Sequence, residues 1–134
     1  MQGDPISPFG QSLDRCLAHP GFLDRFYQHF MASSPAIAER FRDTDFEKQK
    51  GAVVQSLYLM VLAMEGGAAA IEYLDQVARR HGRADLDVEP QLYDVWLECL
   101  IRTVREQDPD FSDDVERSWR ETMRFGIAFM RARY

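Results

Sequence analysis

The sequence lacks any long apolar run and any cluster of basic residues. No stretch approaches the about 18 apolar residues that a membrane helix needs, and no basic and then apolar leader opens the chain. The 16 Lys and Arg are scattered among 22 Asp and Glu, giving a net charge of −6, whereas a phosphate backbone needs clustered positive charge. We therefore expect a soluble cytoplasmic protein with no membrane span and no nucleic-acid partner.

Cysteine and histidine are also scarce. The two cysteines, Cys16 and Cys99, fall on apolar faces of predicted helices without close spacing, which indicates buried thiols in a reducing compartment rather than a disulfide or a metal site. None of the three histidines has a second ligand at zinc spacing. The sequence shows neither a glycine-rich phosphate loop nor a Ser-Gly nucleophile elbow.

No alternating strand pattern and no repeat appears, so the predicted fold is all-α. A length of 134 residues fits one domain, 1–134, with one core. Helix starts are indicated by Ser7-Pro8, Ser34-Pro35, the capping box Thr44-Asp45-Phe46-Glu47, Pro90 and Ser112. Helix breaks are indicated by His19-Pro20-Gly21, Arg42-Asp43, Gly66-Gly67, Gly82–Val88 and Asp108-Pro109-Asp110.

The helix that starts at Phe46 carries one polar residue, Gln49, on its predicted inward side. The other members of that side are apolar: Phe46, Val53, Val54, Leu57, Met60, Val61 and Met64. Tyr27 lies in a similar way within the apolar stripe of the helix that starts at Phe22.

His81 ends the helix that starts at Ala68, directly before Gly82. Ile71, Leu74, Ala78 and His81 follow one another at spacings of 3, 4 and 3, so the histidine falls in line with the apolar stripe and points inward. His19 sits in a break beside proline, and His29, two residues after Tyr27, points away from the tyrosine's face. A single inward histidine or tyrosine is usually a core residue whose polar tip finds a backbone partner, so His81 alone is weak evidence for a ligand site.

The ordered set of residues is more specific than any one of them. Phe26-Tyr27, Ser34-Pro35, Phe41, Gln49, Arg80-His81, Pro90-Gln91-Leu92-Tyr93 and Trp119 follow one another along nearly the whole chain. This pattern resembles the bacterial globins, particularly the single-domain and flavohaemoglobin-type branch. The resemblance implies the globin fold, a three-on-three helical sandwich with a short first helix.

The resemblance also implies a haem b site. His81 matches the proximal iron ligand, Tyr27 and Gln49 the distal residues, Phe41 the phenylalanine that packs on the haem, and Tyr93 a tyrosine near the proximal histidine. Val53, Leu57, Trp96 and Ile127 are expected to line the porphyrin. A ligating imidazole uses one ring nitrogen for iron, and we expect the other to donate to a carbonyl one turn back, such as that of Val77.

One position departs from the family pattern. The branch carries a glutamate on the last helix that joins the proximal histidine and tyrosine, and counting from Trp119 places it near Tyr134. A tyrosine polarises the imidazole less than a carboxylate does, so we expect a neutral proximal partner rather than the strong electron donation of a peroxidase.

The implied function is reversible binding of oxygen and other diatomic gases, such as nitric oxide and carbon monoxide. Nitric oxide oxidation would need a separate reductase. The alternatives are a gas or redox sensor that signals through a separate partner protein, and a globin-like interaction domain without haem. His81 argues against the last of these.

Overall fold

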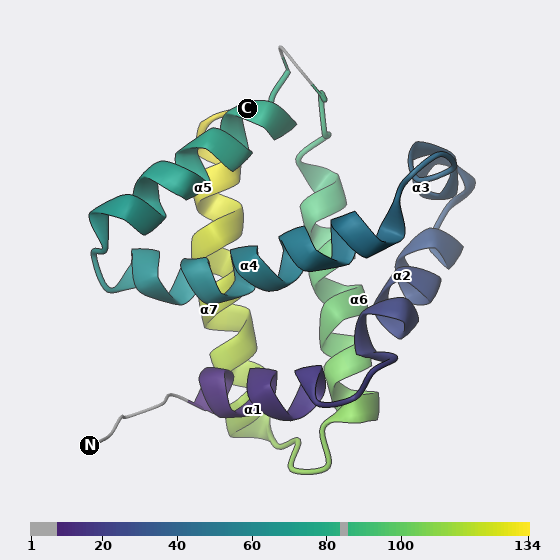
Figure 1. Ribbon diagram of the computed structural model, residues 1–134, viewed down its shortest axis with the longest axis vertical. Coiled ribbons are helices and arrows are strands. Elements are labelled where there is room, and N and C mark those ends of the chain that lie inside the picture. The colour runs from purple at the N-terminus through teal and green to yellow at the C-terminus, as the bar shows by residue number, and fades with distance from the viewer. Residues whose placement is uncertain (1–7, 84–85) are drawn as a thin grey trace. The chain divides into compact units, whose positions relative to one another are not determined.

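The computed structural model describes residues 8–83 and 86–134, and every regular element within these ranges is helical (Figure 1). The all-α prediction is therefore confirmed for the described chain. No helix within it is long and apolar enough to cross a membrane. The helices are α1 (Pro8–Leu17), α2 (Phe22–Ala32), α3 (Pro35–Arg40), α4 (Phe46–Met64), α5 (Ala68–His81), α6 (Gln91–Gln107) and α7 (Asp113–Ala132).

Most helix ends follow from the local signals. The Ser34 hydroxyl accepts from the Ile37 amide at 3.2 Å to cap α3, and the Ser112 hydroxyl accepts from the Val115 amide at 3.2 Å before α7. Gly66, with φ of +88°, takes the left-handed conformation that lets the chain turn after α4. The start and stop signals thus place these ends correctly.

Two details of α4 differ from the prediction. The cap is Asp45 rather than Thr44, because the Asp45 carboxylate, one residue closer to the helix, accepts from the Lys48 amide at 3.3 Å. Met64 is exposed, and Ala63 takes the buried position, because burial follows Leu57 and Met60 at steps of three residues.

The chain divides into two compact units. The first comprises Met1–Asp43 and Val95–Glu121, and the second comprises Thr44–Asp94 and Thr122–Tyr134. The first unit packs around large buried side chains, with the rings of Phe9 and Trp119 4.7 Å apart in an edge-to-face contact. Cys16 and Cys99 are buried free thiols, as predicted. Burial raises the pKa of the Cys16 thiol to about 12, which keeps it protonated.

A buried carboxylate organises the polar contacts of the first unit. Asp108, whose side chain is 0% exposed, accepts from the Ser12 hydroxyl at 2.6 Å and from Arg15 at 2.6 and 2.9 Å. The Trp119 indole N–H donates to the same Ser12 hydroxyl at 2.8 Å. These contacts tie α1 to the residue that follows α6 and to α7 within one hydrogen-bonded group.

In the second unit, α4 packs on α5 and on the C-terminal part of α7. A Cβ atom at Gly126 would lie only 2.7 Å from the Met60 sulfur, so glycine gives the methionine room to pack against α7. Leu57 is fully buried in the same helix face as Met60. This packing fixes the helix that carries Gln49 and Val53.

Candidate functional site

His81 is the last residue of α5 and lies half-buried in the second unit. Its Nδ1 lies 2.8 Å from the carbonyl oxygen of Val77, one turn back along the helix. A carbonyl oxygen only accepts, so Nδ1 donates and the neutral ring carries its lone pair on Nε2. The predicted hydrogen bond is confirmed, and it selects the tautomer that binds a metal through Nε2.

The chain leaves His81 through a close contact with the end of α7. A Cβ atom at Gly82 would lie 3.2 Å from the carbonyl oxygens of both Arg79 and Arg133, which is tighter than an ordinary van der Waals contact. The Arg83 amide donates to the Tyr134 carbonyl at 3.2 Å, and Figure 1 shows the end of α5 beside the C-terminus. Glycine at position 82 therefore allows the end of α7 to support the backbone next to His81.

Asp75 links α5 to the end of α7, a turn and a half before the histidine. Its carboxylate accepts from Arg79 at 2.7 Å and also from Arg133. Hydrogen bonds from Arg79 and then Arg133 hold the pKa of Asp75 below its ordinary value. Neither contact was predicted from the sequence. The i, i+4 spacing of Asp75 and Arg79 indicates the first, whereas Arg133 is 58 residues away and no local pattern reveals it.

Tyr93 lies half-buried near the start of α6, also in the second unit. Burial raises the pKa of its phenol, Arg131 lowers it and Tyr134 raises it, with a net rise that keeps the hydroxyl protonated. The Tyr134 hydroxyl donates to the Asp87 carboxylate. A carboxylate that was not predicted from the sequence thus reaches Tyr134 from the loop after α5.

The remaining predicted residues of the second unit lie on α4 and α7. Gln49 and Val53 are half-buried, and Leu57 and Ile127 are buried. Together with His81 and Tyr93, they give this unit one imidazole, one amide, one phenol and several apolar side chains from four helices.

Three predicted residues belong to the first unit and are linked by ring contacts that include Phe26. The Phe26 ring lies 4.9 Å from that of Tyr27 and 5.8 Å from that of Trp96, measured between ring centres. Tyr27 is buried, and its ring lies 5.5 Å from that of Phe41, which follows α3. The structure therefore brings Tyr27, Phe41 and Trp96 into one aromatic cluster.

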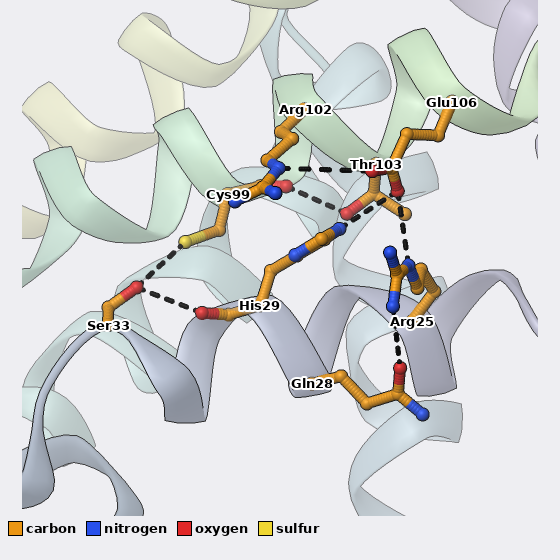
Figure 2. A network of polar contacts seen from close by, with 8 residues as sticks. All are labelled: Arg25, Gln28, His29, Ser33, Cys99, Arg102, Thr103 and Glu106. Atoms are coloured by element: carbon orange, nitrogen blue, oxygen red, sulfur yellow. Dashed lines mark hydrogen bonds and ion pairs between the residues drawn. The ribbon is translucent and has the colours of Figure 1, made fainter.

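His29 faces the protein interior on another side of α2, and it has a specific partner. It is buried, and its Nε2 lies 2.8 Å from the Glu106 carboxylate on α6 (Figure 2). His29 first, and Arg25 in addition, hold the pKa of Glu106 below its ordinary value. The Ser33 hydroxyl lies 3.2 Å from the Cys99 sulfur in the same network. The sequence predicted only that His29 points away from the face of Tyr27 and did not predict this pairing. The pairing holds the rotation of α2 and therefore the direction in which Tyr27 points.

The donor set at His81 fits haem. The described residues contain no group of three or more His, Cys, Asp or Glu side chains that could hold a metal ion together. A single imidazole is the usual protein ligand of a haem iron, since the porphyrin supplies four nitrogens, whereas a structural zinc site needs four protein ligands.

Comparison with known proteins identifies the class that this helical fold and single imidazole define. The family model for globins matches residues 24–129. The chain belongs to the globin family, and the globin fold predicted from the sequence is confirmed.

Two relatives place the chain among bacterial globins. It is 38% identical to a Pseudomonas aeruginosa PAO1 protein whose crystal structure is called structurally highly homologous to a human hemoglobin, with a TM-score of 0.89 and 95% of each chain covered. It is 25% identical over 105 residues to a flavohemoprotein of Vibrio cholerae, which covers 76% of this chain and 26% of that protein. The chain thus spans about a quarter of the length of this relative. Membership in the globin family implies haem and, in general, haem-based gas binding.

Proposed function

We propose that the chain is a single globin domain that binds haem b through His81 and reversibly binds oxygen and other diatomic gases. The observation that carries this proposal is the hydrogen bond from His81 Nδ1 to the Val77 carbonyl. It fixes the proton on one ring nitrogen and so prepares the other as a ligand. Haem, when bound, would supply the iron at which a gas binds.

The other residues of the proposed site would hold the haem or stabilise the bound gas. The apolar side chains among them would hold the porphyrin by burying its surface and excluding water: Phe41, Val53, Leu57, Trp96 and Ile127. Tyr27 and Gln49 would each donate a hydrogen bond to a gas that acquires negative charge. The raised pKa of Tyr93 supports a neutral phenol, rather than an anion, on the proximal side.

We extend this function to nitric oxide oxidation with electrons from a separate reductase. It is supported by the likeness to a protein named as a flavohemoprotein, although the match covers only about a quarter of that protein. The alternative is a sensor whose gas binding is read by a separate partner. A co-purifying reductase would favour nitric oxide oxidation, and a co-purifying signalling protein would favour sensing.

We propose that the protein is located in the cytoplasm, in keeping with its two buried free thiols.

The direct test is a titration of the purified chain with ferric haem. We expect saturation at one haem per chain and a Soret band that shifts on reduction and again on adding oxygen, carbon monoxide or nitric oxide. A chain that takes up no stoichiometric haem would contradict the proposal.

Replacing Tyr27 with phenylalanine tests the proposed hydrogen bond to oxygen. Loss of one such bond costs about 1 to 2 kcal/mol, so the oxygen off-rate should rise about 5- to 30-fold. Carbon monoxide, which accepts hydrogen bonds less well, should leave at nearly its original rate. Stopped-flow displacement measures both rates, and Tyr73→Phe, on α5, serves as the control. Equal acceleration of both gases would argue against the assignment.

A further inference from the structure

A row of polar side chains joins α2 to α6 within the first unit (Figure 2). His29 lies on α2 and Ser33 caps its C-terminal end, and their spacing of four residues places them on one side of the helix. Cys99 and Glu106 are two turns apart and likewise share one side of α6. We call these four residues the α2–α6 seam.

The seam joins the two helices at two points. At the first, His29 Nε2 donates to the Glu106 carboxylate at 2.8 Å, because a carboxylate oxygen only accepts. At the second, the Ser33 hydroxyl donates its single hydrogen to the His29 carbonyl at 2.9 Å. The Cys99 thiol is therefore the donor across the 3.2 Å between its sulfur and the Ser33 oxygen. Two directional contacts one turn apart fix the rotation of α2 about its own axis.

Tyr27 lies on nearly the opposite side of α2 from the seam. It comes two residues before His29, and two residues of an α-helix turn through about 200°. Its ring lies 4.9 Å from that of Phe26 and 5.5 Å from that of Phe41. Ring pairs pack favourably over centroid distances of about 4.5 to 7 Å, whereas a hydrogen bond is confined to about 2.7 to 3.2 Å. The seam therefore constrains the angle of α2 more narrowly than this ring packing does.

A small rotation of α2 would move Tyr27 far enough to break a hydrogen bond. A group about 6 Å from a helix axis moves by about 1 Å when the helix turns by about 10°. An O–H···O hydrogen bond is about 2.8 Å long and is lost by about 3.6 Å. The Tyr27 hydroxyl can therefore reach a bound gas only while α2 keeps its angle.

We propose that His29 and Glu106 are positioning residues, which hold α2 at the angle where Tyr27 donates to oxygen and so slow its release. This inference rests on the role proposed above for Tyr27. It makes a residue of α6 a determinant of gas release, although that residue acts only through α2.

Replacing Glu106 with alanine in the haem-loaded chain tests the proposal. The oxygen off-rate should rise about 2- to 10-fold, less than with Tyr27→Phe, because the hydrogen bond is weakened rather than removed. Carbon monoxide should leave at nearly its original rate. Glu106→Gln keeps an acceptor for His29 and should stay close to the parent. Glu98→Ala is the matched control, since Glu98 also lies on α6 but pairs with Arg120 of α7.

A second variant isolates the histidine, because Glu106→Ala also removes a contact with Arg25. His29→Leu leaves Arg25 and Glu106 in place and should accelerate oxygen release in the same way. Combining it with Glu106→Ala should give no more acceleration than the stronger single variant, because the two residues act as one pair. Gln28→Leu, the same type of change at an exposed neighbour on α2, should leave both off-rates unchanged.

The Tyr27→Phe background separates positioning from a general loosening of the protein. Once the hydroxyl is absent, Glu106→Ala should not accelerate oxygen release further. Nuclear magnetic resonance of the carbon monoxide complex gives a second readout. The ring protons of Tyr27 lie beside the rings of Phe26 and Phe41, so their chemical shifts should move in Glu106→Ala and stay in place in Glu98→Ala. Circular dichroism and urea denaturation check that each variant is folded.

The possible failures of this inference and of the proposed function are distinguishable. If Tyr27→Phe accelerates oxygen release and Glu106→Ala does not, the positioning role is wrong and the role of Tyr27 stands. Equal acceleration by Glu106→Ala with and without the Tyr27 hydroxyl would also overturn the positioning role. If Tyr27→Phe itself has no effect, the proposed role of Tyr27 is wrong, and the positioning role is wrong with it.

Discussion

Replacing His81 with alanine should abolish stable haem binding. The imidazole is the protein's proposed bond to iron. Removing only a hydrogen-bond partner of a metal ligand lowers affinity by up to about 100-fold, so removing the ligand itself should lower haem affinity by more than that. Absorption at the Soret band and the ratio of haem to chain measure this. Added imidazole should restore a haem spectrum, because the small molecule can occupy the space that the side chain leaves.

His19→Ala is the control for this experiment. His19 is exposed between α1 and α2, in the first unit, and its loss should leave haem binding unchanged. If His81→Ala kept an unaltered five-coordinate spectrum without imidazole, another residue would be the ligand. Its helical content, measured by circular dichroism, distinguishes loss of the ligand from loss of the fold.

Replacing Asp108 with alanine should lower the free energy of unfolding by about 3 to 5 kcal/mol. The change removes the acceptor for Arg15, and the buried Ser12 hydroxyl loses the group that accepts its proton, keeping only the indole N–H of Trp119 as a donor. Denaturation in urea measures the effect. Asp110→Ala is the matched control. The Asp110 side chain is 72% exposed, and its distance of 3.7 Å from Arg15 is longer than a hydrogen bond, so its loss should cost at most about 0.5 kcal/mol.

The Asp108 carboxylate also makes the free energy of unfolding depend on pH. Burial raises the pKa of Asp108, but the donors Arg15 and Ser12 and the Asp110 amide outweigh it, so its folded pKa lies below the ordinary value. The unfolded chain then binds the proton more readily, and this contribution is lost as pH falls from about 4 toward the folded pKa. Asp108→Ala should therefore lose less stability than the parent over this range. Parallel curves of unfolding free energy against pH would contradict it.

Features set by neighbours in sequence were predicted well. The end of α5 at His81 and the cap at Ser34 depend on residues within one turn. The bond from His81 to Val77 is likewise an i, i−4 contact, which a helix fixes by geometry alone. Even here one prediction was wrong: the capping box placed the cap at Thr44, whereas the adjacent Asp45 accepts from the Lys48 amide, because both residue types can cap a first turn.

Features set by distant residues were not predicted. Ser12 and Asp108 are 96 positions apart, and an Asp-Pro-Asp stretch indicates a loop rather than a buried anchor. His29 and Glu106 are 77 positions apart, so periodicity placed the histidine on a face without naming its partner. Within the candidate site, the order of residue types indicated the family. The support of His81 by the end of α7 depends on packing that periodicity does not encode.

The distribution of aromatic residues between the units has a practical consequence. Both tryptophans, the half-buried Trp96 and the fully buried Trp119, lie in the first unit, whereas His81, α4 and α5 lie in the second. Tryptophan fluorescence therefore reports the unfolding of one unit, while far-ultraviolet circular dichroism reports helices in both. Coincidence of the two denaturation curves would mean that the units melt as one cooperative structure, and separated midpoints would give each its own stability.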